Sequence, residues 1–254
     1  MPRHVTGAIR LHLLLLSSLT LSTMASPSRA DISVYGLYDL RHTTDRGDNA
    51  SNFPVIEMKG FWPLSFGSFF FKEEIDLGGT RHNQSEVYSE LDQSIKLGHA
   101  TLRGSPLSLH LAYSGGLGVF NQATGGYYVQ NAYWVGPEYG FQALGAYWNV
   151  YAAFRYTNTA APTRDPMVSL WIGKYFLGYK LLIANSLEAW TASYDRFNGT
   201  AVPRKIASWQ LESEVWYKVA QNLSVGTYVR TTRNVYALSD GWLVYPSVGV
   251  RYSF

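Results

Sequence analysis

The sequence has no cysteine, few charges and, beyond its first thirty residues, no long apolar run. The missing cysteine excludes disulfides, thiolate metal sites and a lipid-modified N-terminal cysteine. Charged residues make up 15% of the chain, against about 25% in ordinary soluble domains. No run after position 30 approaches the roughly 18 apolar residues that a membrane-spanning helix needs. Hydrophobic residues still reach 46%, and their dispersal among polar residues is typical of strands with one apolar face and one polar face.

Positive charge is also lacking once the N-terminal segment is set aside. That segment holds Arg3, Arg10 and Arg29 and no acidic residue, which leaves 18 basic residues against 18 acidic ones in the rest of the chain. A basic surface for nucleic acid is therefore not expected. The histidines His42 and His99 lie without metal-ligand spacing, so we expect no metal and no other cofactor.

The N-terminus has the pattern of a secretory signal peptide. Arg3 and Arg10 precede an apolar stretch at 11–23, and small residues stand just before position 31. We expect residues 1–30 to be removed and residues 31–254 to form the mature domain, which begins at Asp31. Cleavage after Ala25 is an alternative, and a retained membrane anchor is another.

The remaining chain predicts short alternating strands separated by turn residues. In the segment 85–97, for example, Val87 and Leu91 fall on one face while Glu90 and Asp92 fall on the other. The expected strands cover residues 32–42, 55–62, 68–77, 85–97, 107–114, 127–135, 144–156, 167–174, 180–194, 207–219, 223–232 and 242–254.

Three features favour a membrane barrel over a soluble sandwich. Many of these strands reach the roughly 9–11 residues of a tilted membrane strand. Aromatic residues such as Trp209 and Tyr217 stand near strand ends, as in the aromatic girdles of outer-membrane barrels. Connections also alternate in length, long at 43–54, 115–126, 195–206 and 233–241, short at 63–67, 175–179 and 220–222. Two connections, 98–106 and 136–143, are longer than this rule.

The sequence thus predicts an all-β fold, a transmembrane antiparallel up-and-down β-barrel of about 12 strands in the bacterial outer membrane. Its outer face would contact membrane lipid and lipopolysaccharide. The chain ends with alternating apolar residues and a terminal Phe254. This ending resembles the C-terminal signal that the barrel-insertion machinery reads.

Several stretches resemble the Tsx-like outer-membrane barrels, the superfamily of nucleoside-specific channels, and more closely its uncharacterised relatives. They are residues 67–71 leading to Asp76, 107–117, 221–227 and 245–254. The resemblance implies a monomeric twelve-stranded barrel with a narrow lumen and a nucleoside as solute. The aromatic residues that contact ligand in that family have no residue-by-residue match in this chain.

The inward faces of the predicted strands carry charges of both signs together with aromatic rings. The candidate lumen residues are Glu74, Tyr88, Glu90, Asp92, His110, Tyr151, Arg155, Glu212, Glu214, Arg230 and Arg251. They could select a small hydrophilic solute, or they could form ion pairs that fill and brace a narrow barrel. Both roles are compatible with one set of residues.

Three functions remain open at this point. The first is a channel for passive diffusion of small hydrophilic solutes, nucleosides among them, with low conductance because side chains largely fill so small a barrel. The second is a non-conducting structural or surface-recognition barrel. The third is a lipid-modifying hydrolase based on Ser108 and His110. Both side chains are expected to face the lumen instead of lipid, so we expect no catalytic site and no enzyme.

Overall fold

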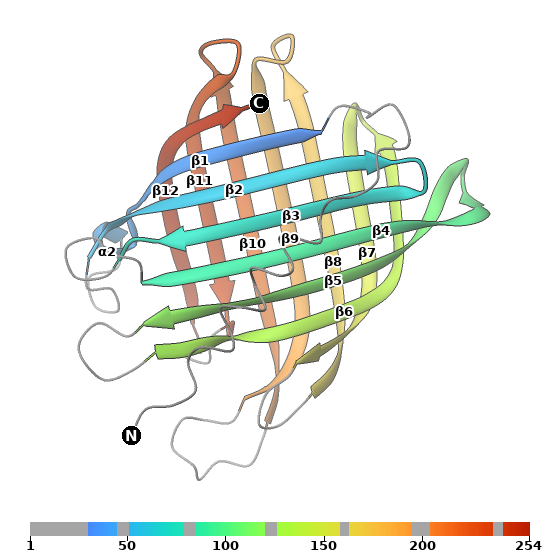
Figure 1. Cartoon of the computed structure of the whole chain (residues 1–254), viewed down its shortest axis with the longest axis horizontal. Coiled ribbons are helices and arrows are strands. Elements are labelled where there is room, and N and C mark those ends of the chain that lie inside the picture. Colours follow the sequence, from blue (N-terminus) through green and yellow to red (C-terminus); the bar gives the residue numbers. More distant parts are fainter. Residues whose placement is uncertain are drawn as a thin grey trace, which may run out of the picture.

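The computed structural model describes residues 30–44, 51–78, 85–119, 126–157, 163–194, 204–235 and 241–254. These residues form one closed antiparallel barrel of twelve strands, in which each strand pairs with its neighbours in sequence (Figure 1). The strands are β1 (Asp31–Asp39), β2 (Phe53–Leu64), β3 (Gly67–Asp76), β4 (Glu86–Leu102), β5 (Ser105–Val119), β6 (Gly126–Ala143), β7 (Ala146–Thr157), β8 (Thr163–Phe176), β9 (Leu181–Tyr194), β10 (Arg204–Lys218), β11 (Leu223–Arg233) and β12 (Trp242–Ser253). The predicted fold class and strand number are confirmed.

Pairing between β1 and β12 closes the barrel. The register places Ser33 opposite Ser253 and Asp39 opposite Ser247. The Phe254 amide donates to the Ile32 carbonyl at 2.9 Å. Closure leaves no unpaired strand edge, which is the condition for placing a sheet in lipid.

The two ends of the barrel differ in their connections. At one end, which we call the turn end, tight turns join β2 to β3, β4 to β5 and β6 to β7, and this is also where β1 begins and β12 ends. The turns at Arg103-Gly104 and Leu144-Gly145 use positive φ angles of 50° and 83°, and of 56° and 68°. The opposite end, the loop end, carries the longer connections, as the sequence pattern predicts.

The predicted connections at 98–106 and 136–143 were wrong. β4 continues to Leu102 and β6 to Ala143, so most of the first segment and all of the second belong to strands. The β4–β5 hairpin therefore extends beyond its neighbours at the turn end (Figure 1). A proline such as Pro137 removes one ladder hydrogen bond, a loss that the many remaining bonds of an 18-residue strand outweigh.

The first predicted strand, 32–42, was too long. β1 ends at Asp39, and α2 (Arg41–Thr44) follows at the loop end. The Arg41 guanidinium contacts the Asp39 carboxylate at 2.7 Å and lies over the rings of Phe53 and Tyr245. Burial alone would lower the pKa of Arg41, but the hydrogen bond and the charge of Asp39 outweigh it and raise the pKa. No helix in the described parts of the chain is long and apolar enough to cross a membrane.

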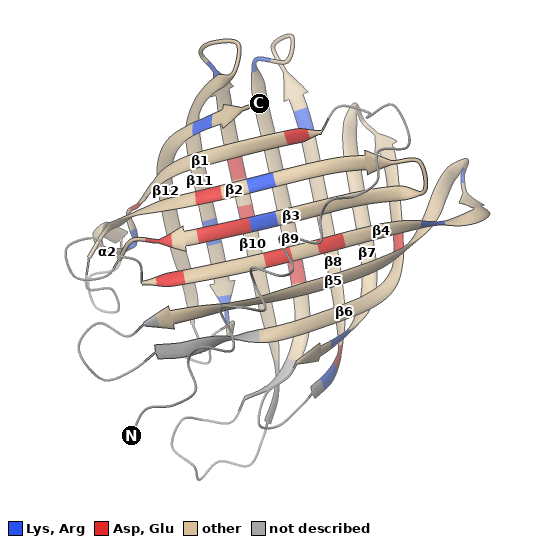
Figure 2. Cartoon of the chain, in the orientation of Figure 1, with Lys and Arg blue, Asp and Glu red and all other residues tan. Residues whose placement is uncertain are grey.

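Side chains alternate between an apolar outer surface and a polar interior. Phe154 is 72% exposed and Val168 54% exposed on the outer surface. Charged residues stand on β2, β3 and β4 among other strands (Figure 2), and of these Glu57, Lys72 and Glu74 are buried. Two pairs of polar residues on the outer face are hydrogen-bonded to each other. Ser89 donates to Glu73 at 2.6 Å, and Ser213 donates to Asn185 at 2.9 Å. These contacts explain how four polar residues stand on an otherwise apolar surface.

Two buried clusters fill part of the lumen. One joins Trp134, Met167 and Trp190 with smaller residues and Tyr151. The other joins Leu37, Val55 and Trp216 with Tyr35, Phe53 and Tyr228. Many of these residues stand in the loop-end halves of their strands, so inward side chains pack the barrel there instead of lining open space.

Candidate solute-binding cavity

A cavity of about 1100 Å³ occupies part of the lumen. Its lining includes the turn residues Leu177 and Tyr179, which are 67% and 77% exposed, so it reaches the turn end of the barrel. Of the buried members of the two clusters, Tyr35 and Tyr151 line it. The second described pocket, lined by Asp39, Arg41 and Arg230, holds only about 10 Å³. Through the rings of Tyr35 and Tyr151, the large cavity therefore borders both clusters.

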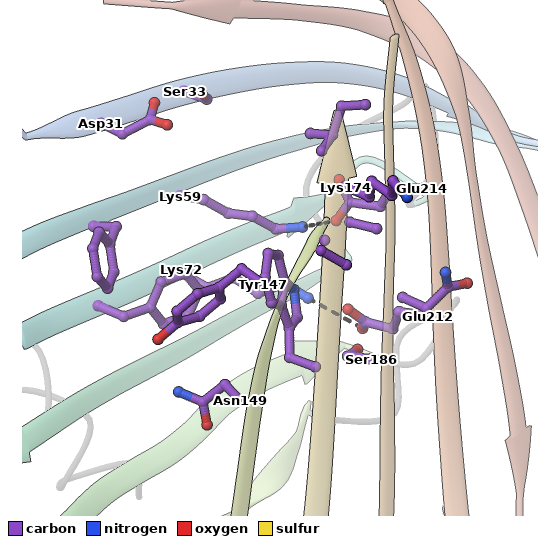
Figure 3. A pocket seen from close by; sticks show the side chains of 18 of the residues that line it. Asp31, Ser33, Lys59, Lys72, Tyr147, Asn149, Lys174, Ser186, Glu212 and Glu214 are labelled. Atoms are coloured by element: carbon purple, nitrogen blue, oxygen red, sulfur yellow. Dashed lines mark hydrogen bonds and ion pairs between the residues drawn. The ribbon is translucent and has the colours of Figure 1, made fainter. Parts of the chain in front are cut away.

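Two lysines form salt bridges across the lumen (Figure 3). Lys59 on β2 contacts Glu214 on β10 at 2.7 Å, and Lys72 on β3 contacts Glu212 on β10 at 3.3 Å. Both lysines also contact Glu57, at 2.9 and 3.3 Å. Because Glu57 is 1% exposed, these contacts compensate a carboxylate that would otherwise be buried at a high cost.

Arg230 on β11 completes this charged network. Its two terminal nitrogens donate to the two oxygens of Glu74, and its Nε donates to Glu212 at 3.2 Å. Such a bidentate pair fixes geometry as well as charge. The network, which we call the cross-barrel network, consists of Glu57, Lys59, Lys72, Glu74, Glu212, Glu214 and Arg230.

A second polar group surrounds His110 on β5. Its Nδ1 lies 3.0 Å from Glu138, its Nε2 accepts from the Trp134 indole at 3.2 Å, and its ring stacks on Tyr151 with centroids 4.1 Å apart. Asn149 donates to the other oxygen of Glu138 at 2.6 Å. Since the indole nitrogen can only donate, Nε2 carries a lone pair and the imidazole proton sits on Nδ1.

The cavity brings together most of the sequence-predicted lumen residues. Its lining includes Glu90, Asp92, His110, Tyr151, Glu212, Glu214 and Arg251. Three others lie beside it: Tyr88 donates to Glu90 at 2.8 Å, while Glu74 and Arg230 pair within the cross-barrel network. Arg155 is apart from the cavity lining, with its guanidinium 5.2 Å from the centroid of the Trp190 ring.

Sequence reasoning missed Glu57, Lys59 and Glu138. The first two lie on the correctly predicted strand 55–62, where the alternation of Val55, Glu57 and Lys59 was a usable signal. Glu138 was missed because its segment had been taken for a connection. Among aromatics, Tyr147 and Trp171 are 44% and 39% exposed and contact each other in the cavity with ring centroids 6.0 Å apart.

Ser108 and His110 stand on the inner face of β5, as predicted, but the ring nitrogens of His110 are taken by Glu138 and Trp134. This arrangement lacks the nucleophile–base contact that hydrolysis requires. Among the described residues, no group of His, Asp or Glu is arranged to hold a metal ion.

Comparison with known proteins gives a fold and no family. No protein-family model matches the chain, and no curated protein matches it. The solved structure of the NanC porin is similar with a TM-score of 0.51 and 10% identity, over 88% of this chain and 100% of that one. The KdgM porin gives a TM-score of 0.48 and 12% identity, over 87% and 99% of the two chains. At such identity, the likeness to NanC shows that the chain has a porin-type barrel fold. A Tsx-like assignment is not confirmed.

Proposed function

We propose that the chain is an outer-membrane channel through which small hydrophilic solutes diffuse passively. The observation that carries this proposal is the polar cavity of about 1100 Å³ inside a closed barrel. The outer face supports a membrane location, because exposed apolar residues such as Phe154 and Val168 cover strands that pair with their neighbours in a closed barrel.

The route to the membrane is part of the same proposal. Residues 1–30 act as a signal peptide, and the mature chain starts at Asp31. Phe254 is the residue that the barrel-insertion machinery recognises. Its backbone N–H donates a hydrogen bond to the Ile32 carbonyl, where β12 meets β1. The mature barrel acts as a monomer surrounded by lipid and lipopolysaccharide.

Among uncharged solutes, nucleosides are the first to test. The exposed rings of Tyr147 and Trp171 offer π-faces on which a planar base can stack. The protein, produced with its own N-terminal segment and purified from outer membranes, would be reconstituted into liposomes. Uptake of uridine would then be compared with uptake of sugars of similar size. We expect both to enter, uridine faster, and equal rates would remove the nucleoside preference.

A second candidate is a non-conducting barrel that serves as a structural or surface-recognition element. The two packed clusters favour it, because their side chains fill part of the described lumen. The same liposomes decide between the two functions. If neither uridine nor a sugar enters faster than into protein-free liposomes, the channel proposal is wrong and the second candidate stands.

A further inference from the structure

The carboxylates of the cavity differ sharply in how they are compensated. Those of the cross-barrel network each contact a lysine or an arginine. Glu90 and Asp92 on β4, and Glu188 on β9, lie outside that network and have no salt bridge in the described structure. Glu90 accepts from the Tyr88 hydroxyl at 2.8 Å, and Glu188 accepts from the Tyr151 hydroxyl at 3.1 Å.

Asp92 provides a second observation, because one of its carboxylate oxygens lacks a hydrogen-bond donor. Its Oδ1 atom is buried and has no hydrogen-bond partner. Asp92 stands beside Glu90 on the inner face of β4, and Glu188 is near enough to both for their charges to interact. A buried carboxylate oxygen without a donor is costly, and a donor that carries positive charge compensates it best.

The lining of the cavity as a whole also carries an excess of negative charge. Among the described residues that line it, seven are Asp or Glu and four are Lys or Arg. A low-dielectric cavity with an excess of one charge concentrates ions of the opposite sign. The excess therefore favours cations over anions along the route to Asp92.

Aromatic rings nearer the turn end suit the same class of solute. Tyr147 and Trp171 expose their rings within the cavity, and the face of such a ring attracts an ammonium group by a cation–π interaction. A solute that enters from the turn end would meet these rings before it reaches the three carboxylates.

We propose that the cavity selects small organic cations, whose ammonium group binds at Glu90, Asp92 and Glu188. This inference rests on the proposed channel function and names its solute class. Each carboxylate of the cross-barrel network contacts a lysine or an arginine, so the network holds the barrel in shape. Glu90, Asp92 and Glu188, which have no salt bridge in the described structure, bind the solute.

The test uses three solutes of similar size in liposomes that carry the full protein purified from outer membranes. Putrescine is a dication, erythritol is uncharged and succinate is a dianion, and each has four carbons. We expect uptake in the order putrescine, erythritol, succinate. A potassium chloride gradient across a planar bilayer provides a second measurement on the unaltered protein, and its reversal potential should show preference for potassium.

Two variants locate the effect. The double variant Glu90→Gln/Asp92→Asn keeps shape and hydrogen-bonding oxygens but removes charge. We expect the putrescine-to-succinate uptake ratio to fall about fivefold or more, since a unit charge at contact distance in water contributes about 1 kcal/mol. The matched control is Glu73→Gln, because Glu73 lies on the neighbouring strand but faces outward to Ser89. It should leave the ratio unchanged.

The outcomes separate the two proposals. If none of the three solutes enters faster than into protein-free liposomes, the channel itself fails, and the cation site falls with it. Uptake of erythritol together with succinate as fast as putrescine leaves the channel intact and overturns the cation site. If Glu73→Gln lowers the ratio as much as the double variant does, selectivity does not arise from the cavity. Heat-modifiable migration of each variant in gels verifies that the barrel has folded.

Discussion

Lys72 is the residue on which the compensation of the cross-barrel network most depends. Its ammonium group contacts Glu57, Glu74 and Glu212 at 3.3 to 3.5 Å, and it is 5% exposed. Each contact alone is long for a charged hydrogen bond. Together they stabilise the network, because one ammonium group contacts three carboxylates that are largely shielded from water.

Lys72→Met should therefore destabilise the barrel more than most single substitutions. The methionine keeps the length of the side chain but removes one of the cations that contact Glu57, Glu74 and Glu212, whose remaining partners are Lys59 and Arg230. Removing one partner from a buried charge network costs up to about 3–5 kcal/mol. Equilibrium urea unfolding in detergent micelles, followed by tryptophan fluorescence, measures the change. Lys174→Met is the control, because Lys174 donates only to the Leu144 carbonyl and should cost at most about 1.5 kcal/mol. Equal losses would show that Lys72 has no special role.

The contacts of His110 predict which of its nitrogens carries the proton. Trp134 donates to Nε2 while Glu138 accepts from Nδ1, so nitrogen NMR of the labelled protein should show an unprotonated Nε2. Trp134→Phe removes the donor and should move the Nε2 resonance, whereas Trp148→Phe, whose indole donates to the Ala143 carbonyl, should not. A protonated Nε2 in the unaltered protein would contradict the assigned contact.

At the scale of the element, glycine allows β6 and β7 to approach closely. A Cβ atom built on Gly136 would lie 1.9 Å from the Ala152 carbonyl oxygen, a separation that no side chain tolerates. Gly36 on β1 differs, since a Cβ there would meet only Val250, at 3.5 Å. A side chain at Gly136 would therefore clash with β7, whereas there is room for one at Gly36.

Gly136→Ala should thus separate the two strands locally and destabilise the barrel by about 1–3 kcal/mol, the usual cost of overpacking. Gly36→Ala should change stability by less than about 1 kcal/mol, because it adds an ordinary van der Waals contact and reduces the freedom of the unfolded chain. Urea midpoints of the two variants measure the difference. A reversed order would show that β6 can move away from β7 at little cost.

The sequence predicts a strand and its outer face correctly where apolar and polar residues alternate without a break. It predicts the bounds of a strand wrongly where residues typical of turns stand inside the strand. β12 was predicted with its outer face correct, because Val244, Val248 and Val250 alternate without interruption. β6 was cut short because Gly136 and Pro137 usually mark turns, and only pairing with two neighbours keeps them in a strand. The cross-barrel contacts of Lys59 and Lys72 could not be predicted, because they depend on which strands face each other across a closed barrel.

At the scale of the whole molecule, the barrel combines an open half with a filled one. The cavity reaches the turn end, whereas Trp190 and its neighbours pack together in the lumen. Barrels of this size leave little room once inward side chains are large. The packed cluster should therefore limit conductance more than the charged cavity does.

Trp190→Ala should accordingly raise single-channel conductance. Trp190 is 8% exposed and packs against Met167 and Trp134 in the lumen, so removing its indole opens space among the packed side chains there. Planar-bilayer recordings in potassium chloride give the measurement. The control is Trp209→Ala, since Trp209 is 37% exposed on the outer face of β10 and its loss should leave conductance unchanged. Unchanged conductance in both variants would mean that the limiting constriction lies outside this cluster, and an equal rise in both would mean that general loosening of the barrel, not the width of its lumen, sets the current.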